Sequence, residues 1–204
     1  MYTPEIYKNE NKQAVENFIH ENGFGLLINY SNQKLCATHI PLVLRTTNIG
    51  TQILEGHVSI DNPQGKNFVN DEMVLVVFSG ANAYISSSWY DHENVPTWNY
   101  EAVHVYGKIK IIEGKKVIES LKKLVDKYES EVDFPTKIED YSKKTMLQVR
   151  GIVAFQIEIT DIRAVKKMSQ NRDDKNYQNI IIELKKVNTN ESIAVANEMK
   201  KCPI

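Results

Sequence analysis

Side chains able to hold a small ligand are concentrated between residues 84 and 107. Both tryptophans of the chain, Trp89 and Trp98, lie in this segment, together with tyrosines, serines and two histidines. The mixture suits a flat ligand with a polar edge, because apolar faces cover the ring while a few donors satisfy the edge. The rim of a packed β-barrel can use the same side chains without a ligand, so both interpretations stay open. The candidate site residues of this segment are Ser88, Trp89, Tyr90 and Trp98.

Two apolar segments place further polar side chains where a ligand can be held. The first carries Thr38 and His39, which point to opposite faces if the segment is a strand. The second carries Gly56 and His57 and leads to a turn at Asn62, whose exposed amides can hold an anion. Each histidine can equally be a satisfied core residue, and the turn can be a plain connection.

The short basic segment Lys166–Arg172 combines side chains that can engage a phosphate group. Guanidinium, ammonium, hydroxyl and amide groups can each donate to one of several phosphate oxygens. Short basic loops are also common without a ligand, so the segment alone does not decide. Its candidate residues are Lys167, Ser169, Gln170 and Arg172.

Several familiar catalytic and metal-binding patterns are missing from the sequence. It holds no GxGxxG, GxxxxGK[ST], GxSxG or HExxH motif. The five histidines lack the spacing of metal ligands, so we predict no metal, and a site of His39, His57 and His104 is the alternative. Cys36 and Cys202 form no CxxC pair, which is typical of a protein in a reducing cytoplasm.

The composition is that of a folded, globular chain. Hydrophobic residues make up 42% and charged residues 25% of the 204 residues, which suits one large domain with or without a small appendage. A net charge of −1 gives no general attraction to nucleic acid, although residues 161–204 carry nine Lys/Arg against six Asp/Glu. Without a signal-peptide pattern or an apolar run of ~18 residues, we expect a cytoplasmic protein with no membrane span.

Hydrophobic periodicity predicts the elements that position these side chains. It indicates strands at 24–30, 35–44, 51–58, 73–78, 98–112 and 151–159, and helices at 10–21, 115–128, 139–147, 173–186 and 191–200. Pro41 favours an edge position or a bulge. Because strands arrive in runs, we predict a mainly β, α+β fold: an antiparallel barrel with helices packed outside and a helical C-terminus. We expect the barrel domain at 1–170 and a helical extension at 171–204, packed on the barrel or on a partner subunit.

Short motifs in a fixed order cover most of residues 1–185. They are Met1–Pro4, Asn22–Gly25, Ala37–Leu42, Gly56–Val58, Asn62–Gln64, Ala83–Ser86, Ser88–Tyr90, Val95–Tyr100, Ala102–Gly107 and Ser169–Arg172. Each is weak alone, but the ordered set resembles the PaiB family of FMN-binding negative transcriptional regulators.

The resemblance implies a split β-barrel related to the pyridoxamine-phosphate-oxidase-like flavoproteins, with FMN at a homodimer interface. It makes Thr38, His39, Gly56 and Asn62 candidates for the flavin pocket. It makes the basic segment 166–172 the candidate phosphate site, reaching across the dimer. Trp89, Tyr90 and Trp98 become candidate walls of the flavin ring.

The chain departs from the family pattern at two places. Ser87 stands where many members carry proline, and Ile60 and Asp61 stand where members often carry small residues. Since a carboxylate facing a phosphate repels it, we expect Asp61 to point away from any phosphate site.

Three functions remain open from the sequence. The first is a dimeric FMN-binding transcriptional repressor, although no helix-turn-helix with a basic recognition helix is visible, so DNA contact would be indirect or through the C-terminal helices. The second is an FMN-dependent oxidoreductase acting on a small molecule, with Tyr90, His92 and His104 as acid–base candidates. The third is a haem or small-molecule binding protein on the same barrel.

Overall fold

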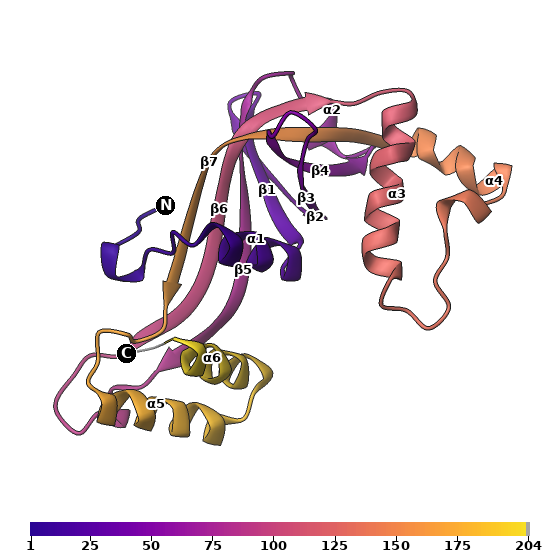
Figure 1. Ribbon diagram of the computed structural model, residues 1–204. Coiled ribbons are helices and arrows are strands. Elements are labelled where there is room, and N and C mark those ends of the chain that lie inside the picture. Colours follow the sequence, from indigo (N-terminus) through magenta and orange to yellow (C-terminus); the bar gives the residue numbers. More distant parts are fainter. Residues whose placement is uncertain (203–204) are drawn as a thin grey trace. The chain divides into compact units, whose positions relative to one another are not determined.

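The computed structural model of the chain describes residues 1–202 (Figure 1). These residues form two compact units. The barrel unit comprises Ile19–Phe78 and His104–Ile162, and the helical unit comprises Met1–Phe18, Ser79–Val103 and the residues from Arg163 onward. Each unit therefore joins segments that are far apart in the sequence, and the division expected at residue 170 stays a prediction.

Most of the predicted elements are present within a few residues of their expected bounds. The strands are β1 (Phe24–Ser31), β2 (Lys34–Pro41), β3 (Val43–Thr46), β4 (Gln52–Ser59), β5 (Met73–Ile85), β6 (Thr97–Ile111) and β7 (Ile152–Lys167). The α-helices are α1 (Lys12–Glu21), α2 (Pro63–Lys66), α3 (Lys115–Glu129), α4 (Lys143–Met146), α5 (Asp174–Val187) and α6 (Asn190–Lys201). Short 3-10 turns are η1 (Glu5–Tyr7), η2 (Ser87–Trp89), η3 (Ile138–Asp140) and η4 (Leu147–Gly151).

The sheet closes toward a barrel because its two edge strands are neighbours in sequence. The strand order is β2-β1-β5-β6-β7-β4-β3, and β1–β2, β1–β5, β3–β4 and β4–β7 pair antiparallel. Only Leu42 separates β2 from β3, so the sheet must curve until its edges approach each other. Pro41 is the last residue of the edge strand β2, as predicted from its missing N–H donor. The predicted α+β barrel is confirmed.

Alternating burial builds the core of the barrel unit. Leu27 of β1 and Leu54 of β4 are fully buried, and the buried ring of Phe155 on β7 meets Phe68 edge-on at 5.3 Å between centroids. Fully burying side chains of this size contributes roughly 1.5–3 kcal/mol each. A Cβ at Gly56 would lie 2.7 Å from Leu42 Cδ2, so only glycine lets the β2–β3 connection pack against β4 at this point.

The helical unit has its own apolar core. α5 and α6 lie side by side (Figure 1) and pack on the end of β5, with Ile85, Met168 and Tyr177 among the buried residues. The Tyr177 hydroxyl donates to the Met199 carbonyl at 2.6 Å and joins the two helices. Side-chain caps begin both helices.

Several features of the fold were not predicted. β5 and β7 run to Ile85 and Lys167, well beyond the predicted ends at 78 and 159. The prediction stopped short because polar residues interrupt the apolar pattern in the second half of each strand. The second half of β7 is held in part by backbone pairing between Lys8 and Val165. The predicted helix at 139–147 is three short helical pieces instead.

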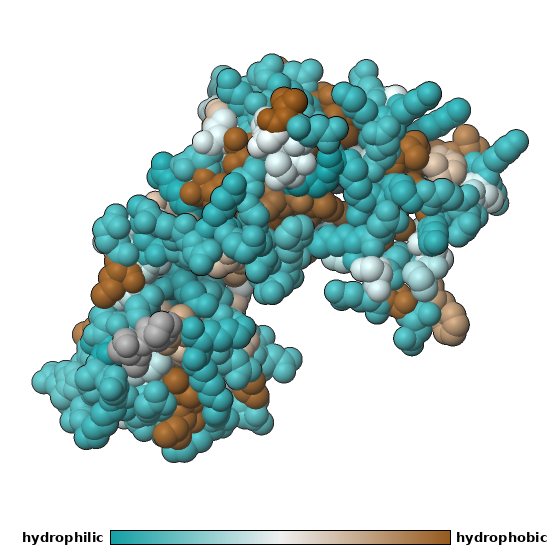
Figure 2. Space-filling model, in the orientation of Figure 1, coloured by the Kyte–Doolittle hydropathy of each residue, from teal (hydrophilic) through white to brown (hydrophobic). Residues whose placement is uncertain are grey.

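The surface drawn in Figure 2 is mostly hydrophilic, with separate apolar patches. None of the helices within residues 1–202 is long and apolar enough to cross a membrane.

Candidate functional site

The predicted site residues fall into two groups, one in each unit. The barrel unit holds Thr38, His39, Gly56, His57 and Asn62, and the helical unit holds Ser88, Trp89, Tyr90, Trp98, Lys167, Ser169, Gln170 and Arg172. Their geometry divides them further into side chains that are engaged within the protein and side chains that are free to contact a ligand.

Thr38 and Asn62 belong to a polar network that joins α2 to the sheet. The Thr38 hydroxyl donates to Gln64 Oε1 in a short contact and accepts from Asn62 Nδ2 at 3.1 Å. Asn62 also caps α2, because its Oδ1 accepts from the Gln64 amide at 2.9 Å. These two side chains are therefore held in place by the protein itself.

Gln64 is the centre of this network and was not among the predicted site residues. It is only 2% exposed, and its Nε2 donates to the Leu27 carbonyl at 3.1 Å and to Asn29 Oδ1 at 3.0 Å. Asn29 is buried too, and its Nδ2 has no hydrogen-bond partner among the described residues. A buried donor without an acceptor is costly, so Asn29 Nδ2 marks a point where a ligand or water oxygen fits. The sequence signal that could have identified Gln64 is Asn62-Pro63, a pair that often begins a helix and so places Gln64 in the first helical turn.

The other residues of the barrel group differ in exposure. His39 is exposed, and its ring stacks on Phe24 with centroids 6.0 Å apart and planes inclined by 20°. His57 is half-buried, and burial lowers the pKa of its imidazole, which favours the neutral form. The Asp61 side chain is 92% exposed and lies 4.0 Å from Lys66 Nζ, as expected of a carboxylate directed to solvent.

Lys167 and Arg172 form a pair of cations in the helical unit. Burial and the nearby Arg172 charge both lower the pKa of Lys167. Lys167 Nζ donates to Thr97 Oγ1 and lies 5.8 Å from the centre of the Tyr7 ring. Neither cation has a carboxylate partner among residues 1–202. Two neighbouring cations without an anion are repulsive, and a bound anion would relieve that repulsion.

Tyr90 and Arg172 add two unsatisfied polar atoms to this pair. The Arg172 guanidinium lies over the Tyr90 ring at 5.0 Å from its centre. Arg172 Nε and the Tyr90 hydroxyl are both buried, and neither has a hydrogen-bond partner in the described part of the chain. We name Tyr90, Lys167 and Arg172 the cationic cluster. Its two free donors and two positive charges suit a phosphate group.

Ser169 and Gln170 are engaged within the chain. Ser169 is 2% exposed and has a left-handed φ of 60°, and its hydroxyl donates to Asn99 Oδ1 at 3.0 Å. Gln170 accepts from the Met168 amide at 2.7 Å and donates to the Lys166 carbonyl at 2.6 Å. These bonds fix the turn after β7, so both residues position Arg172, and their predicted contact with phosphate stays a prediction.

The aromatic residues do not form one wall. Trp89 and Trp98 line a cavity of about 330 Å³, whose lining residues include Tyr84, at the ends of α5 and α6, whereas Tyr90 belongs to the cationic cluster. The hydroxyl of Ser88 lies 2.9 Å from that of Ser86, which caps η2, so the serines begin this short helix.

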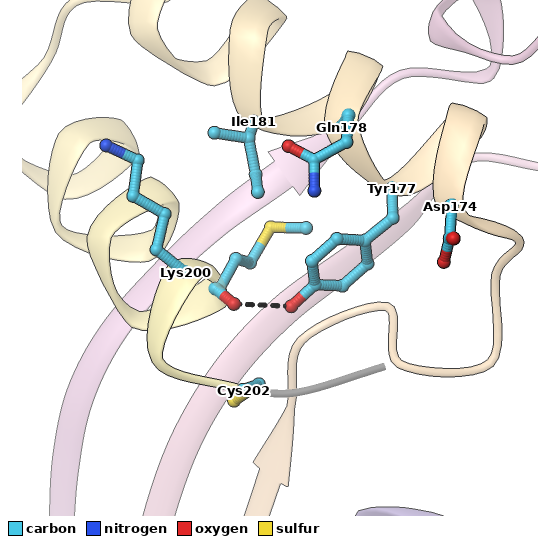
Figure 3. A pocket seen from close by; sticks show the side chains of 7 residues that line it. Asp174, Tyr177, Gln178, Ile181, Lys200 and Cys202 are labelled. Carbon is cyan, nitrogen blue, oxygen red and sulfur yellow. Dashed lines mark hydrogen bonds between the residues drawn. The ribbon is translucent and has the colours of Figure 1, made fainter.

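A second hollow of about 480 Å³ lies between α5 and α6, and Figure 3 shows its lining. Tyr177 lies across it, with its hydroxyl bonded to the Met199 carbonyl. Its charged side chains, Asp174 and Lys200, are of opposite sign, so it has no preference for an anion or a cation.

No three His, Cys, Asp or Glu side chains within residues 1–202 are grouped as a metal site requires. The alternative of His39, His57 and His104 as ligands to one metal therefore has no counterpart in the structure.

Comparison with known proteins identifies the family of the chain. The sequence profile of the family described as "Putative FMN-binding domain" matches residues 1–161. A protein of Bacillus subtilis (strain 168), "Protease synthase and sporulation protein PAI 2", is 42% identical over 185 residues, which is 90% of this chain and 89% of the relative.

Two solved structures share the fold. The FAD and haem binding protein from Mycobacterium smegmatis has a TM-score of 0.62 at 11% identity and covers 84% of this chain and 78% of its own. The flavocytochrome Anf3 from Azotobacter vinelandii has a TM-score of 0.57 at 13% identity and covers 85% of this chain and 75% of its own. At these identities the two structures support the split-barrel fold alone. The family profile and the bacterial relative confirm the resemblance found in the sequence: the chain belongs to the PaiB family of FMN-binding proteins.

Proposed function

We propose that this protein is a homodimeric, FMN-binding regulator that represses transcription, with the FMN phosphate bound at the cationic cluster. The observation that carries the proposal is the pair of unsatisfied buried atoms, Arg172 Nε and the Tyr90 hydroxyl, beside the ammonium of Lys167, which has no carboxylate partner among the described residues. When bound, FMN supplies a redox-active ring, and the protein can respond to the oxidation state of that ring. The 42% identical relative carries sporulation in its name, a process that depends on changes in gene expression, and this supports a regulatory role.

The cationic cluster fits FMN because its chemistry matches a phosphate dianion. Two cations give Coulomb attraction, and the guanidinium and phenol add directed hydrogen bonds in a partly desolvated place. The turn held by Ser169 and Gln170 keeps Arg172 over the Tyr90 ring. The side chain is thereby positioned before a ligand arrives, which reduces the entropy lost on binding.

A comparison of FMN with riboflavin tests this role, because the two ligands differ only in the phosphate. Arg172→Ala should weaken FMN at least about tenfold, the loss expected for one charge-assisted contact, and leave riboflavin nearly unchanged. Binding is measured by the quenching of flavin fluorescence. Arg150→Ala, which removes the same charge at an exposed position, is the control. Equal losses for both ligands would remove Arg172 from the phosphate site.

An apolar face of the barrel unit supports the proposed homodimer. Phe24 and Tyr30 of β1 are 64% and 63% exposed, and Leu35, which pairs with Tyr30 across β1 and β2, is 76% exposed. They lie on the face of the sheet opposite the buried Leu27. Apolar surface of this kind is commonly covered by another protein, and an edge strand is a ready template for a second copy.

Repression requires that the protein changes transcription, directly or through a partner. Purified protein, with and without FMN, is mixed with labelled promoter DNA at increasing salt. Binding that weakens with salt and depends on FMN would support direct repression. If no DNA binds at low salt, the regulation is indirect, and the proposal then depends on an effect of gene deletion on transcript levels.

His104 favours a second candidate, an FMN-dependent oxidoreductase. Its Nδ1 is buried without a hydrogen-bond partner among the described residues, and burial lowers the pKa of the ring. A neutral imidazole with a free nitrogen can accept or relay a proton. Oxidation of NADH or NADPH by the FMN-loaded protein, lost in His104→Gln with FMN affinity kept, would favour the enzyme over the regulator.

A further inference from the structure

The cavity lined by Trp89 and Trp98 has the chemistry of a cation site. We propose that it binds a trimethylammonium group, on a small molecule such as choline or on a methylated lysine, and we name it the aromatic cavity. Its volume of about 330 Å³ is within the range of small-molecule sites. The inference goes beyond the proposed function, since it requires neither FMN nor DNA.

Three aromatic side chains from three different elements form the walls. Tyr84 comes from β5, Trp89 from η2 and Trp98 from β6. The rings of Tyr84 and Trp98 lie 6.1 Å apart at 68°, so they present two walls at a steep angle rather than a closed stack. Both residues are about half exposed, at 48% and 54%. Their ring surfaces are therefore available to a ligand, and the negative faces of such rings attract quaternary ammonium groups.

The charge of the lining also favours a cation as the ligand. Glu191 lines the cavity and makes no ion pair with any described residue, and no described Lys, Arg or His is part of the lining. An unpaired carboxylate beside aromatic faces attracts a cation and repels the phosphate of FMN. For this reason we assign the cavity to a cation, in place of the flavin-wall role that the sequence suggested for Trp89 and Trp98.

The two helices contribute further residues to the lining of the cavity. Leu184 and Val187 come from the end of α5, and Thr189 and Ser192 bond to each other in the capping box that begins α6. Both hydroxyl oxygens accept a hydrogen bond within the cap. A trimethylammonium group has no hydrogen-bond donor and therefore needs no acceptor from them.

Intrinsic fluorescence reports on this site directly, because the protein has two tryptophans and both line the cavity. FMN-free protein is titrated with choline and, separately, with 3,3-dimethylbutan-1-ol, which has the same shape without the charge. We expect saturable change with choline and at least tenfold weaker binding of the neutral alcohol. A peptide with trimethyl-lysine and its unmodified form are then titrated in the same way, to decide between the two sources of the group.

Variants separate the charge from the walls. Glu191→Gln should weaken choline at least threefold, Trp98→Ala at least tenfold, and Trp98→Phe should retain most of the affinity. Glu93→Gln removes a charge at an exposed position outside the lining and should change nothing. Glu191→Gln removes no packing, so it remains informative if Trp98→Ala unfolds.

FMN affinity is measured for each variant, and calorimetry on FMN-loaded protein repeats the choline titration. Unchanged FMN affinity together with choline binding supports a separate cation site. The proposal is overturned if choline and the trimethyl-lysine peptide both fail to bind, if the neutral alcohol binds as well as choline, or if FMN excludes choline.

Discussion

At the scale of single residues, Gln64 shows how much of the barrel unit depends on one buried amide. Its side chain bonds to Thr38, Asn29 and the Leu27 carbonyl. Gln64→Leu would leave these partners buried and unsatisfied, and each such group costs about 1–3 kcal/mol. We expect the free energy of unfolding to fall by at least about 2 kcal/mol in urea titrations.

A matched substitution separates the loss of the amide hydrogen bonds from the effect of introducing a leucine side chain. Gln148 is exposed, so Gln148→Leu should change stability by less than about 0.5 kcal/mol. Equal stability of the two variants would mean that water replaces the lost amide and that the network contributes little.

His57 predicts a dependence of stability on pH. Burial lowers the pKa of its imidazole below the ordinary value of 6.5, so the unfolded chain binds a proton more readily than the folded one. Stability should therefore rise with pH between the lowered folded-state pKa and about 6.5, and be unaffected by His57 above that window. His57→Gln should flatten the curve of unfolding free energy between pH 5 and 7. A curve of unchanged slope would show that His57 stays hydrated.

The sequence singled out candidate site residues but did not show which of their polar atoms are already bonded within the protein. Lys167 and Arg172 lie in the basic segment that the sequence singled out, and their role in a phosphate site stays a prediction. Ser169 and Gln170 look equally suited, yet their hydrogen bonds are made within the turn after β7 and with Asn99, far away in sequence. Gly56 was attributed to ligand approach, and the group that approaches it is Leu42. Such contacts depend on tertiary packing, which no local pattern contains.

At the scale of elements, Lys166 joins α6 to the sheet. Its Nζ lies 2.8 Å from Glu101 on β6 and 2.7 Å from Glu198 on α6. Burial alone would lower the pKa of Lys166, but its bonds to the two carboxylates outweigh burial and raise that pKa. Burial also raises the pKa of Glu101 in spite of the nearby ammonium. The three charges are thus mutually dependent.

Lys166→Ala should destabilise the attachment of α6. It leaves two neighbouring carboxylates without their cation, and we expect a loss of about 2 kcal/mol, below the value for fully buried pairs because Lys166 is 23% exposed. Hydrogen exchange of the α6 amides should accelerate. Lys186→Ala, which breaks an exposed pair within α5, is the control and should cost under about 0.5 kcal/mol. If both variants exchange alike, Lys166 does not hold α6.

Elements with a continuous apolar pattern were predictable, and those that depend on partners were not. α1, α3, α5 and α6 follow their amphipathic stripes within two residues. β7 continues through polar residues to Lys167, because backbone pairing with Lys8 at Val165 compensates for a weak pattern. The split of the predicted strand 35–44 into β2 and β3 follows from the closing of the sheet at Leu42.

At the scale of the whole molecule, the apolar face on β1 and β2 predicts self-association. Tyr30 and Leu35 pair across the two strands and are both largely exposed. The double substitution Tyr30→Lys and Leu35→Lys would bury ammonium groups in any interface formed there, at a cost of several kcal/mol each. We expect the dissociation constant of the proposed dimer to rise at least about a hundredfold, with monomer mass in sedimentation equilibrium at micromolar concentration.

A control and a second measurement make this prediction specific. Ile49→Lys places the same charge at a site that is 89% exposed, in the turn between β3 and β4, and should leave the dimer intact. The family resemblance implies FMN at a homodimer interface, so we expect the double variant also to bind FMN more weakly, while circular dichroism shows that the fold is kept. A double variant that remains dimeric would place the interface on another surface. A monomer that binds FMN with full affinity would show that one subunit holds the cofactor by itself.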